Sequence, residues 1–434
     1  MASRKPLHEL GLAEAARLIA AGEITSVDLV SACLARVAER EGQVKAWSFI
    51  DPEMALAQAR ACDATPAKGA LHGVPIGVKD VLDTFDMPTE MGSPIYAGHR
   101  PTQDAACVAL SRMAGAVIMG KTVTCEFAGM APGATTNPHD AARTPGGSSS
   151  GSGAAVADFM TPLAFGTQTG GSVLRPAAFC GVIGYKPTYG TFNRAGLKFA
   201  AESLDTIGLI ARNVDDMALM SSVLTGGNFV TPSAPGAPLR IGLCRTYLWE
   251  KADASARAGL QRAADAARAA GARVSDYEMP KHFSSLTATR EIFNNVERAR
   301  SLPFEWMHHR EQISAALSRS VEAGFATSVE DYIDAKRFAE RCRIEADAIF
   351  DDYDVLLTPA ANGEAPVGLH YAGDPAFQGL WTLLHTPTIA VPAGRGESGM
   401  PVGVQLIARR YDDKKLLDAA HWLIARAGVT ATMN

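Results

Sequence analysis

The chain has 434 residues, of which 47% are hydrophobic and 20% are charged, a balance that is typical of soluble globular proteins and excludes global disorder. The 41 Lys and Arg residues against 46 Asp and Glu give a net charge of −5, so nothing in the charge points to nucleic acid or an anionic membrane surface. The seven cysteines contain no C-x-x-C pair, which argues against a disulfide framework and a zinc knuckle. No apolar run approaches the ~20 residues that span a bilayer, and we expect a reduced, cytoplasmic protein.

Helical and strand patterns alternate along the chain. They predict helices over 8–21, 26–40, 104–114, 213–225, 254–270, 285–318, 329–350 and 412–427, and strands over 75–82, 115–119, 162–167, 239–244, 354–358, 388–392 and 402–408. This interleaving predicts a single α/β/α layered domain, residues 1–434, around a large twisted sheet that is mostly parallel or mixed. The segment 226–238 has strands on both sides, so we interpret it as a surface loop rather than a linker.

A match to the phosphate-binding loop G-x-x-x-x-G-K-[ST] lies at residues 115–122, GAVIMGKT. In such a loop the four central residues expose backbone N–H groups to phosphates and are usually small or polar. Here they are Ala, Val, Ile and Met, which are typical of a core strand. We therefore interpret this segment as a buried strand with Lys121 at its polar end.

A second match, Gly147 to Gly151 (GSSSG), fits the G-x-S-x-G nucleophile elbow of α/β-hydrolases. An elbow needs a buried strand in front of it, and the preceding HDAARTPG is not one. Only composition marks Asp354 and His385 as candidates for the other members of a catalytic triad. The pattern therefore disfavours an elbow.

The sequence Thr169-Gly170-Gly171-Ser172 follows the strand-like PLAFGT. Two glycines remove steric cover, so the four backbone N–H groups could converge on one point. This arrangement is typical of an oxyanion hole, formed by Thr169, Gly170, Gly171 and Ser172, with Ser172 as a nucleophile in the same turn. The alternative is a tight turn with a purely structural role.

Three separated blocks occur in one order: GVKDV around Lys79, PGGSSSGSGAAVA around Ser148, and GTQTGGS ending at Ser172. Together they resemble the amidase signature family, with the signature core over about residues 70–210, and the similarity continues through SLDTIGLIARNVDDMA and PVGVQLIA. The resemblance implies the amidase fold, amidohydrolase activity on linear amides, a Ser–cis-Ser–Lys triad, and no metal or cofactor.

In this family the lysine is the general base, so the resemblance assigns that role to Lys79. Ser148, after a cis peptide bond, relays the proton, and Ser172 forms an acyl-enzyme. A lysine must be neutral to act as a base, yet its reference pKa is ~10.4 and useful bases lie near ~7–8. Burial behind an apolar strand would lower that pKa. The alternative is an ion pair of Lys79 with Asp80 or Asp83.

Many family members read G-G-S-I-R-x-P, whereas here the nucleophile is followed by Val-Leu-Arg175-Pro. The arginine at +3 resembles the malonamidase branch, as do PTEMGSPIYAGHRP and LWTLLHTPTIAVP. In that branch this arginine binds the substrate carboxylate, so we expect a small carboxylate-bearing amide such as malonamate. The alternative is that Arg175 pairs with a protein carboxylate such as Asp205.

The segments 285–345 and 361–380 are predicted to line or cover the pocket. They carry aromatic residues of undetermined orientation: Phe293, Phe304, Trp306 and Phe377.

Three classes of function remain open. The first is a stand-alone small-molecule amidase, whose substrate could also be a biuret-like, urea-like or aryl amide. The second is the ammonia-releasing component of a tRNA-dependent amidotransferase, and the third is a non-catalytic scaffold, which the filled triad positions disfavour. For the first class we expect no nucleic-acid or membrane partner, and a homodimer only by analogy with the family.

Overall fold

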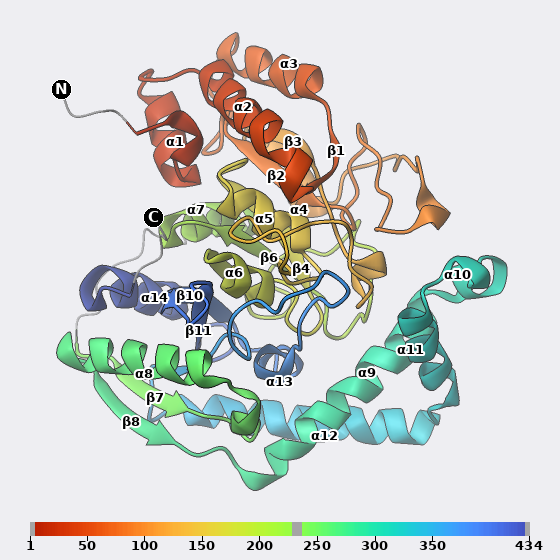
Figure 1. Ribbon diagram of the computed structural model, residues 1–434, viewed down its shortest axis with the longest axis vertical. Coiled ribbons are helices and arrows are strands. Elements are labelled where there is room, and N and C mark those ends of the chain that lie inside the picture. Colours follow the sequence, from red (N-terminus) through yellow and green to blue (C-terminus); the bar gives the residue numbers. More distant parts are fainter. Residues whose placement is uncertain (1–4, 228–236, 430–434) are drawn as a thin grey trace.

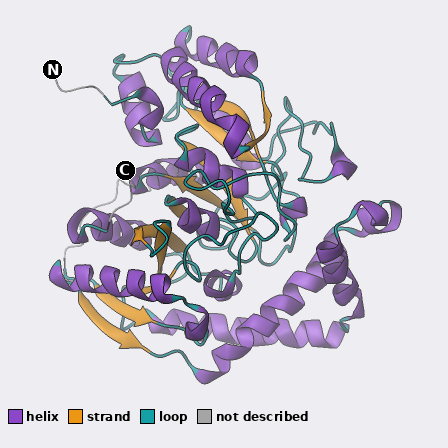
Figure 2. Cartoon of the chain, viewed as in Figure 1, coloured by secondary structure: helices purple, strands orange, loops and turns teal. Residues whose placement is uncertain are grey.

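The computed structural model describes residues 5–227 and 237–429, and the eleven strands in these ranges form one sheet (Figures 1 and 2). Its order is β1-β3-β2-β4-β6-β5-β10-β11-β9-β7-β8. The strands are β1 (Trp47–Ile50), β2 (Pro75–Lys79), β3 (Val117–Thr122), β4 (Leu163–Gln168), β5 (Ile183–Lys186), β6 (Thr206–Ala211), β7 (Arg240–Cys244), β8 (Arg273–Tyr277), β9 (Val355–Pro359), β10 (Thr388–Arg395) and β11 (Pro401–Ile407). Strand β2 runs parallel to β3 and β4, and β7 runs parallel to β8 and β9, whereas the other pairs are antiparallel. The predicted α/β class with a large mixed sheet is confirmed.

Helices surround this sheet. They are α1 (Leu12–Ala20), α2 (Ser26–Val44), α3 (Pro52–Asp63), α4 (Ala106–Met113), α5 (Ser150–Ala157), α6 (Leu174–Cys180), α7 (Val214–Thr225), α8 (Ala254–Ala269), α9 (Leu286–Ser301), α10 (Pro303–His308), α11 (Ala315–Ala326), α12 (Val329–Ile349), α13 (Ala376–Leu383) and α14 (Asp413–Ala427). Helices α11 and α12 each pack on α9, and the three form an arm on one side of the molecule, with α10 at its tip (Figure 1). Within the described ranges, we find no helix that combines the length and the apolar character needed to cross a membrane.

Helix α2 begins where the sequence predicts. The Thr25 side chain accepts a hydrogen bond from the Asp28 backbone N–H, and the Asp28 carboxylate accepts one from the Thr25 N–H, so the two residues form a capping box. Its apolar stripe, which includes Leu29, Val30 and Val37, is buried. The capping box and the apolar periodicity both indicate a helix that begins at Ser26, and for this reason α2 can be predicted from the sequence alone.

One predicted helix is wrong in its extent. Residues 285–318 form α9, α10 and the start of α11, not a single helix. The break falls at Leu302 and Pro303, because proline cannot donate the helical N–H and starts the next helix at its first position. The strand predicted over 75–82 ends at Lys79, and the strand predicted over 115–119 runs from Val117 to Thr122.

The remaining differences concern short elements. Strands β1, β5, β6 and β8 and helices α3, α6 and α13 were not predicted; β8 is a mostly exposed edge strand without apolar alternation. Of the loop predicted over 226–238, residues 228–236 lie outside the described residues.

The segment matching a phosphate-binding loop is a strand. All six residues of β3 are buried, and Lys121 Nζ lies 3.3 Å from a carboxylate oxygen of Asp80 and donates to the carbonyl of Pro88 at 3.1 Å. The interpretation of this match as a buried strand is confirmed.

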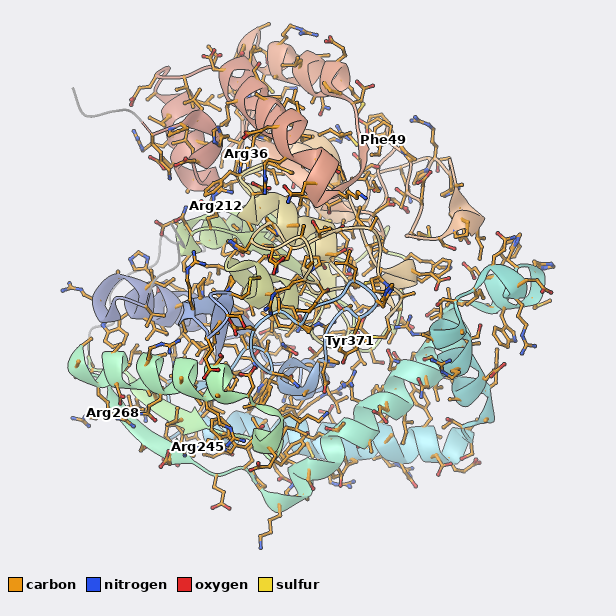
Figure 3. The ribbon with its side chains drawn as sticks, viewed as in Figure 1. Arg36, Phe49, Arg212, Arg245, Arg268 and Tyr371 are labelled. Carbon is orange, nitrogen blue, oxygen red and sulfur yellow. The ribbon has the colours of Figure 1, made fainter. Side chains whose placement is uncertain are left out.

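Buried Arg212 is held structurally through its two Nη atoms, although its Nε has no hydrogen-bond partner among the described residues (Figure 3). Its Nη1 donates to the carbonyls of Val156 at 2.8 Å and Thr161 at 2.9 Å, and its Nη2 donates to the Leu10 carbonyl at 2.6 Å. These bonds tie the N-terminal segment to the central layer, because the Leu10 carbonyl belongs to that segment and the other two carbonyls belong to the end of α5 and the turn after it.

Candidate active site

Lys79 lies at the carboxyl end of β2, beside the end of the parallel strand β4. Its side chain is fully buried, and its Nζ lies 2.8 Å from Ser148 Oγ and 2.7 Å from Thr167 Oγ1. No ion pair among the described residues includes Lys79, and Asp80 pairs instead with Lys121. The alternative of an ion-paired Lys79 is therefore wrong.

Burial lowers the pKa of Lys79 from 10.5 to about 7. Nearby Cys125 and Asp205 oppose this shift, and the positive charge of Arg175 adds to it. The ammonium and the neutral amine are thus both populated near neutral pH, as a general base requires.

Ser148 follows a cis peptide bond with Gly147, as the sequence resemblance implies, and it is fully buried in front of α5. Its carbonyl accepts a hydrogen bond from the Cys125 N–H at 3.0 Å. The next residue, Ser149, donates its N–H to the Ser172 carbonyl at 3.2 Å. The segments around Ser148 and Ser172 therefore lie side by side.

The turn from Thr169 to Ser172 connects β4 to α6. The Oε1 atom of Gln168 holds it by accepting the N–H groups of Val173 at 2.9 Å and Leu174 at 3.1 Å. Among the described residues, no recorded hydrogen bond uses the N–H of Gly170, Gly171 or Ser172, so these donors remain available to an oxyanion.

Ser172 as a whole residue is 7% exposed. The hydrogen bonds of the described residues include none between its hydroxyl and that of Ser148. Catalytic hydrogen bonds are often long or poorly aligned without substrate, so the expected link between the two hydroxyls stays a prediction. Thr169 Oγ1, at the other end of the turn, donates to the buried carboxylate of Asp205.

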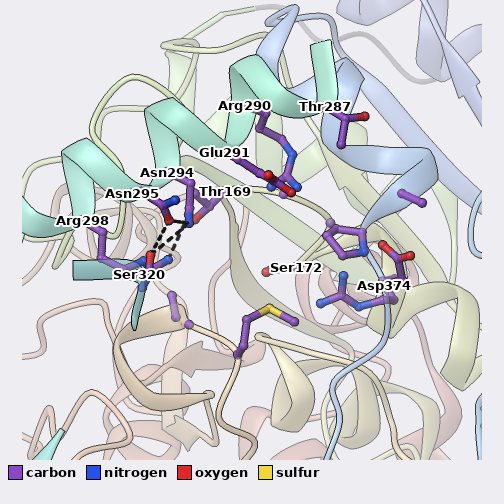
Figure 4. Close-up of a pocket in the computed structure, with 18 of the residues that line it drawn as sticks. Thr169, Ser172, Thr287, Arg290, Glu291, Asn294, Asn295, Arg298, Ser320 and Asp374 are labelled. Carbon is purple, nitrogen blue, oxygen red and sulfur yellow. Dashed lines mark hydrogen bonds between the residues drawn. The ribbon is translucent and has the colours of Figure 1, made fainter. Parts of the chain in front are cut away.

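A cavity of about 370 Å³ opens over Ser172 (Figure 4). Its walls are the 169–172 turn, Arg175, the loop that leads into α13, and polar side chains of α9. In Figure 4, Ser172 lies between the α9 side chains and Asp374. A cavity of this size accommodates a small molecule.

Arg175 is buried in the wall of this cavity. Its Nε donates to the carbonyl of Ala372 at 2.7 Å and its Nη2 to that of Gly147, but its buried Nη1 has no partner among the described residues. Burial lowers the pKa of Arg175 to about 10, which leaves it cationic at neutral pH. Because Asp205 is held by Thr169 and by the N–H groups of residues 200 and 201, the predicted alternative of an Arg175–Asp205 pair is wrong.

The family model of the amidases matches residues 28–417, which is most of the chain. The chain belongs to the amidase family. It is similar to a glutamyl-tRNA(Gln) amidotransferase subunit from Chloroflexus aggregans (strain MD-66 / DSM 9485), with 36% identity over 95% of each chain.

Solved structures agree with this assignment. A crystal structure of an amidase is 30% identical with a TM-score of 0.88 and covers 96% of this chain and 100% of that one. The native peptide amidase from Stenotrophomonas maltophilia is 28% identical with a TM-score of 0.82 and covers 98% of each chain. The protein is therefore an amidohydrolase.

The alternative of a nucleophile elbow at residues 147–151, with Asp354 and His385 as its catalytic partners, is wrong. Asp354 is bound to Arg240 at 2.9 Å, and the His385 ring stacks on Tyr189 with centroids 4.0 Å apart. Neither residue shares a hydrogen bond with Ser149, whose hydroxyl donates to the Thr167 carbonyl at 3.3 Å.

The predicted pocket segments are right only in part. Residues 287–320 and 374–380 contribute to the cavity, but none of the four aromatic candidates lines it: Phe293 and Phe377 are buried elsewhere, Phe304 is exposed, and Trp306 packs against Phe325.

Sequence reasoning missed Thr167 and the polar face of α9. Arg290, Asn294 and Arg298 recur at a spacing of four and share one face of that helix, and this signal was present in the sequence.

Proposed function

We propose that this amidase hydrolyses the terminal amide of a small molecule that carries a carboxylate, and that it releases ammonia through an acyl-enzyme on Ser172. The observation that carries this proposal is the unpartnered Nη1 of buried Arg175 in the wall of the Ser172 cavity. A buried guanidinium nitrogen without an acceptor is costly, and a substrate carboxylate would supply that acceptor. The domain containing this site would comprise residues 1–434, with its signature core over about residues 70–210.

The mechanism is the one that the family resemblance implies, and the contact of Lys79 Nζ with Ser148 Oγ at 2.8 Å supports its first step. Neutral Lys79 accepts the proton of Ser148 as Ser148 takes that of Ser172, whose Oγ attacks the amide carbon. The N–H groups of residues 169–172 hold the developing oxyanion, and one such donor is worth roughly 2.7–4 kcal/mol in the best-studied protease case. The relay then returns the proton to the leaving ammonia, and water hydrolyses the ester on Ser172.

Ammonia release from a panel of amides tests this proposal. The panel contains malonamate, succinamate, malonamide, biuret, benzamide and glutamine, with wild type, Ser172→Ala and Arg175→Ala assayed in parallel. We expect anionic amides to react fastest and Arg175→Ala to raise their KM by roughly 10- to 100-fold, the value of one charge-assisted hydrogen bond. Exposed Arg268 on α8 (Figure 3) provides a matched control, since Arg268→Ala should change nothing. Preference for benzamide or malonamide together with a silent Arg175→Ala would refute the carboxylate requirement.

A serine-directed fluorophosphonate identifies the nucleophile independently. We expect labelling of wild type and of Ser149→Ala, and none of Ser172→Ala. If Ser149→Ala were not labelled and Ser172→Ala were labelled, the assignment of Ser172 as the nucleophile would be contradicted.

A second candidate is the ammonia-releasing component of a tRNA-dependent amidotransferase. The similarity to a glutamyl-tRNA(Gln) amidotransferase component over 95% of both chains favours it over a malonamate-specific enzyme. Its amide donor would be glutamine, which also carries a carboxylate for Arg175 to bind.

Two observations separate the candidates. A second chain that co-purifies with this one, together with glutamine hydrolysis only in the presence of charged tRNA, would establish the amidotransferase function. Turnover of malonamate by the isolated chain would establish a stand-alone amidase of the malonamidase type.

A further inference from the structure

The second guanidinium group of the cavity, that of Arg290 on α9, has no counterpart in the mechanism above. It lines the same cavity as Ser172 and Arg175, and in Figure 4 its head group points toward the space above Ser172. Arg290 lies so close to the oxyanion turn that a Cβ atom on Gly170 would be 3.3 Å from its Nη1. It also lies so close to α13 that a Cβ atom on Gly379 would be 2.7 Å from its Nε. Two glycines thus leave the room that this side chain occupies.

Burial lowers the pKa of Arg290, and the nearby charges of Glu291 and Asp374 oppose this shift, but neither carboxylate forms an ion pair with Arg290 among the described residues. No recorded hydrogen bond or ion pair joins its guanidinium to any of the described residues, in contrast to Arg212 with its three carbonyl acceptors. The two carboxylates of the cavity wall are Glu291 and Asp374, and Asp374 is bound to Lys251 at 2.8 Å. The position of Arg290 is therefore stabilised by neither a salt bridge nor a carbonyl cage.

The cavity wall as a whole is positive. It contains four cationic side chains, those of Arg175, Lys251, Arg290 and Arg298, against the two carboxylates of Glu291 and Asp374, and its net charge is +2. Arg290 and Arg175 are close enough that the charge of one lowers the pKa of the other. Two neighbouring guanidinium groups that repel each other are stabilised by a ligand that brings one negative charge to each.

We propose that the cavity binds a small amide with two anionic groups, one held by Arg175 and the other by Arg290. This inference rests on the proposed function for the identity of the reacting amide, and it deepens that function by naming a dianionic substrate class. Asn294 on α9 and Ser320 on α11 also line the cavity and provide further hydrogen-bonding capacity beside the second anion. A monoanion such as malonamate would occupy only the Arg175 position.

The test compares two amides that differ by one carboxylate. The dianion is 3-carbamoylpentanedioate, and the monoanion is 3-carbamoylpentanoate, in which a methyl group replaces one carboxylate. Isothermal titration calorimetry measures their Kd with the Ser172→Ala protein, so that binding is separated from turnover. Each of Arg290→Gln, Arg290→Lys, Arg175→Gln and the exposed control Arg268→Gln is added to that background.

We expect the dianion to bind roughly 10- to 100-fold more tightly than the monoanion, as one additional charge-assisted contact implies. Arg290→Gln should abolish this preference and leave the Kd of the monoanion within about threefold, because Arg290 contacts only the second anion. Arg290→Lys should restore part of the preference, Arg175→Gln should weaken both ligands, and Arg268→Gln should weaken neither.

Equal binding of the two amides with Arg290 intact, or equal weakening of both by Arg290→Gln, would overturn the inference and make Arg290 a structural residue. Hydrolysis by wild type is measured separately. Turnover of monoanionic amides without dianion preference overturns only this inference, whereas tight dianion binding without hydrolysis of any amide overturns only the proposed function.

Discussion

The pH dependence of the reaction gives the sharpest test of the triad, because it follows from the burial of one lysine. Only the neutral amine of Lys79 can accept a proton, and burial places its pKa at about 7. At pH 7 about half of the molecules then carry the neutral form, against about 0.03% for a lysine with a pKa of 10.5. The structure therefore provides about 1,000-fold more base at neutral pH than an exposed lysine would. We expect kcat/KM to fall about tenfold per unit below pH 6 and to reach a plateau near pH 8.

Initial rates of ammonia release between pH 5 and 10 measure this profile. The substrate is a neutral amide, malonamide, so that the substrate itself does not titrate. Lys79→Ala should reduce kcat by about 10²- to 10⁴-fold, and its residual activity should lose the limb near pH 7. An acid limb that persists at the same pH in Lys79→Ala, or a rate that climbs without a plateau to pH 10, would refute the assignment of Lys79 as the base.

Three further predictions concern individual side chains. Lys79 has a pKa of 10.5 in the unfolded chain and about 7 in the folded protein, so the stability of the wild type rises between pH 7 and pH 10.5. Lys79→Met removes this group and should therefore add at most about 4 kcal/mol to the free energy of unfolding at pH 7, and nothing above pH 10.5. Urea titrations at both pH values measure the difference. Gly171→Ala should reduce kcat by about 10²-fold or more, because its Cβ atom would lie 2.6 Å from the buried Oε1 of Gln378 and displace the oxyanion turn, and wild-type kcat in this variant would contradict the turn's role. Thr25→Ala should lower the free energy of unfolding by about 1 kcal/mol through loss of the α2 capping box, without any change in KM; an unchanged urea midpoint would contradict this expectation.

The parts of the fold and site that the sequence predicts are those encoded over short distances. The start of α2 and the buried strand at Val117–Thr122 depend on neighbouring residues, and the glycine-rich blocks around Ser148 and Ser172 carry a resemblance that spans only tens of residues. The sequence also contained a local signal for the end of α9, namely Pro303, but the helical periodicity on either side led to the prediction of one continuous helix.

Contacts between distant segments were beyond the sequence. The pairing of Lys79 with Thr167 depends on β2 and β4 being parallel neighbours, which a strand prediction does not specify. The state of Arg175 depends on the carbonyl of Ala372, which lies 197 residues away along the chain. Whether a buried guanidinium is satisfied or has an unpartnered nitrogen can be decided only when such long-range acceptors are in place.

The origin of the cavity walls has a consequence for how this enzyme could diversify. All groups assigned to bond cleavage come from residues 79–172, whereas most of the facing wall comes from residues 287–320 and 374–380. Substitutions in α9 and α11 can therefore change the range of substrates without disturbing the strands that position the catalytic residues. Chimeras that exchange this arm between related enzymes should inherit the substrate preference of the arm's donor and the bond-cleaving chemistry common to both parents.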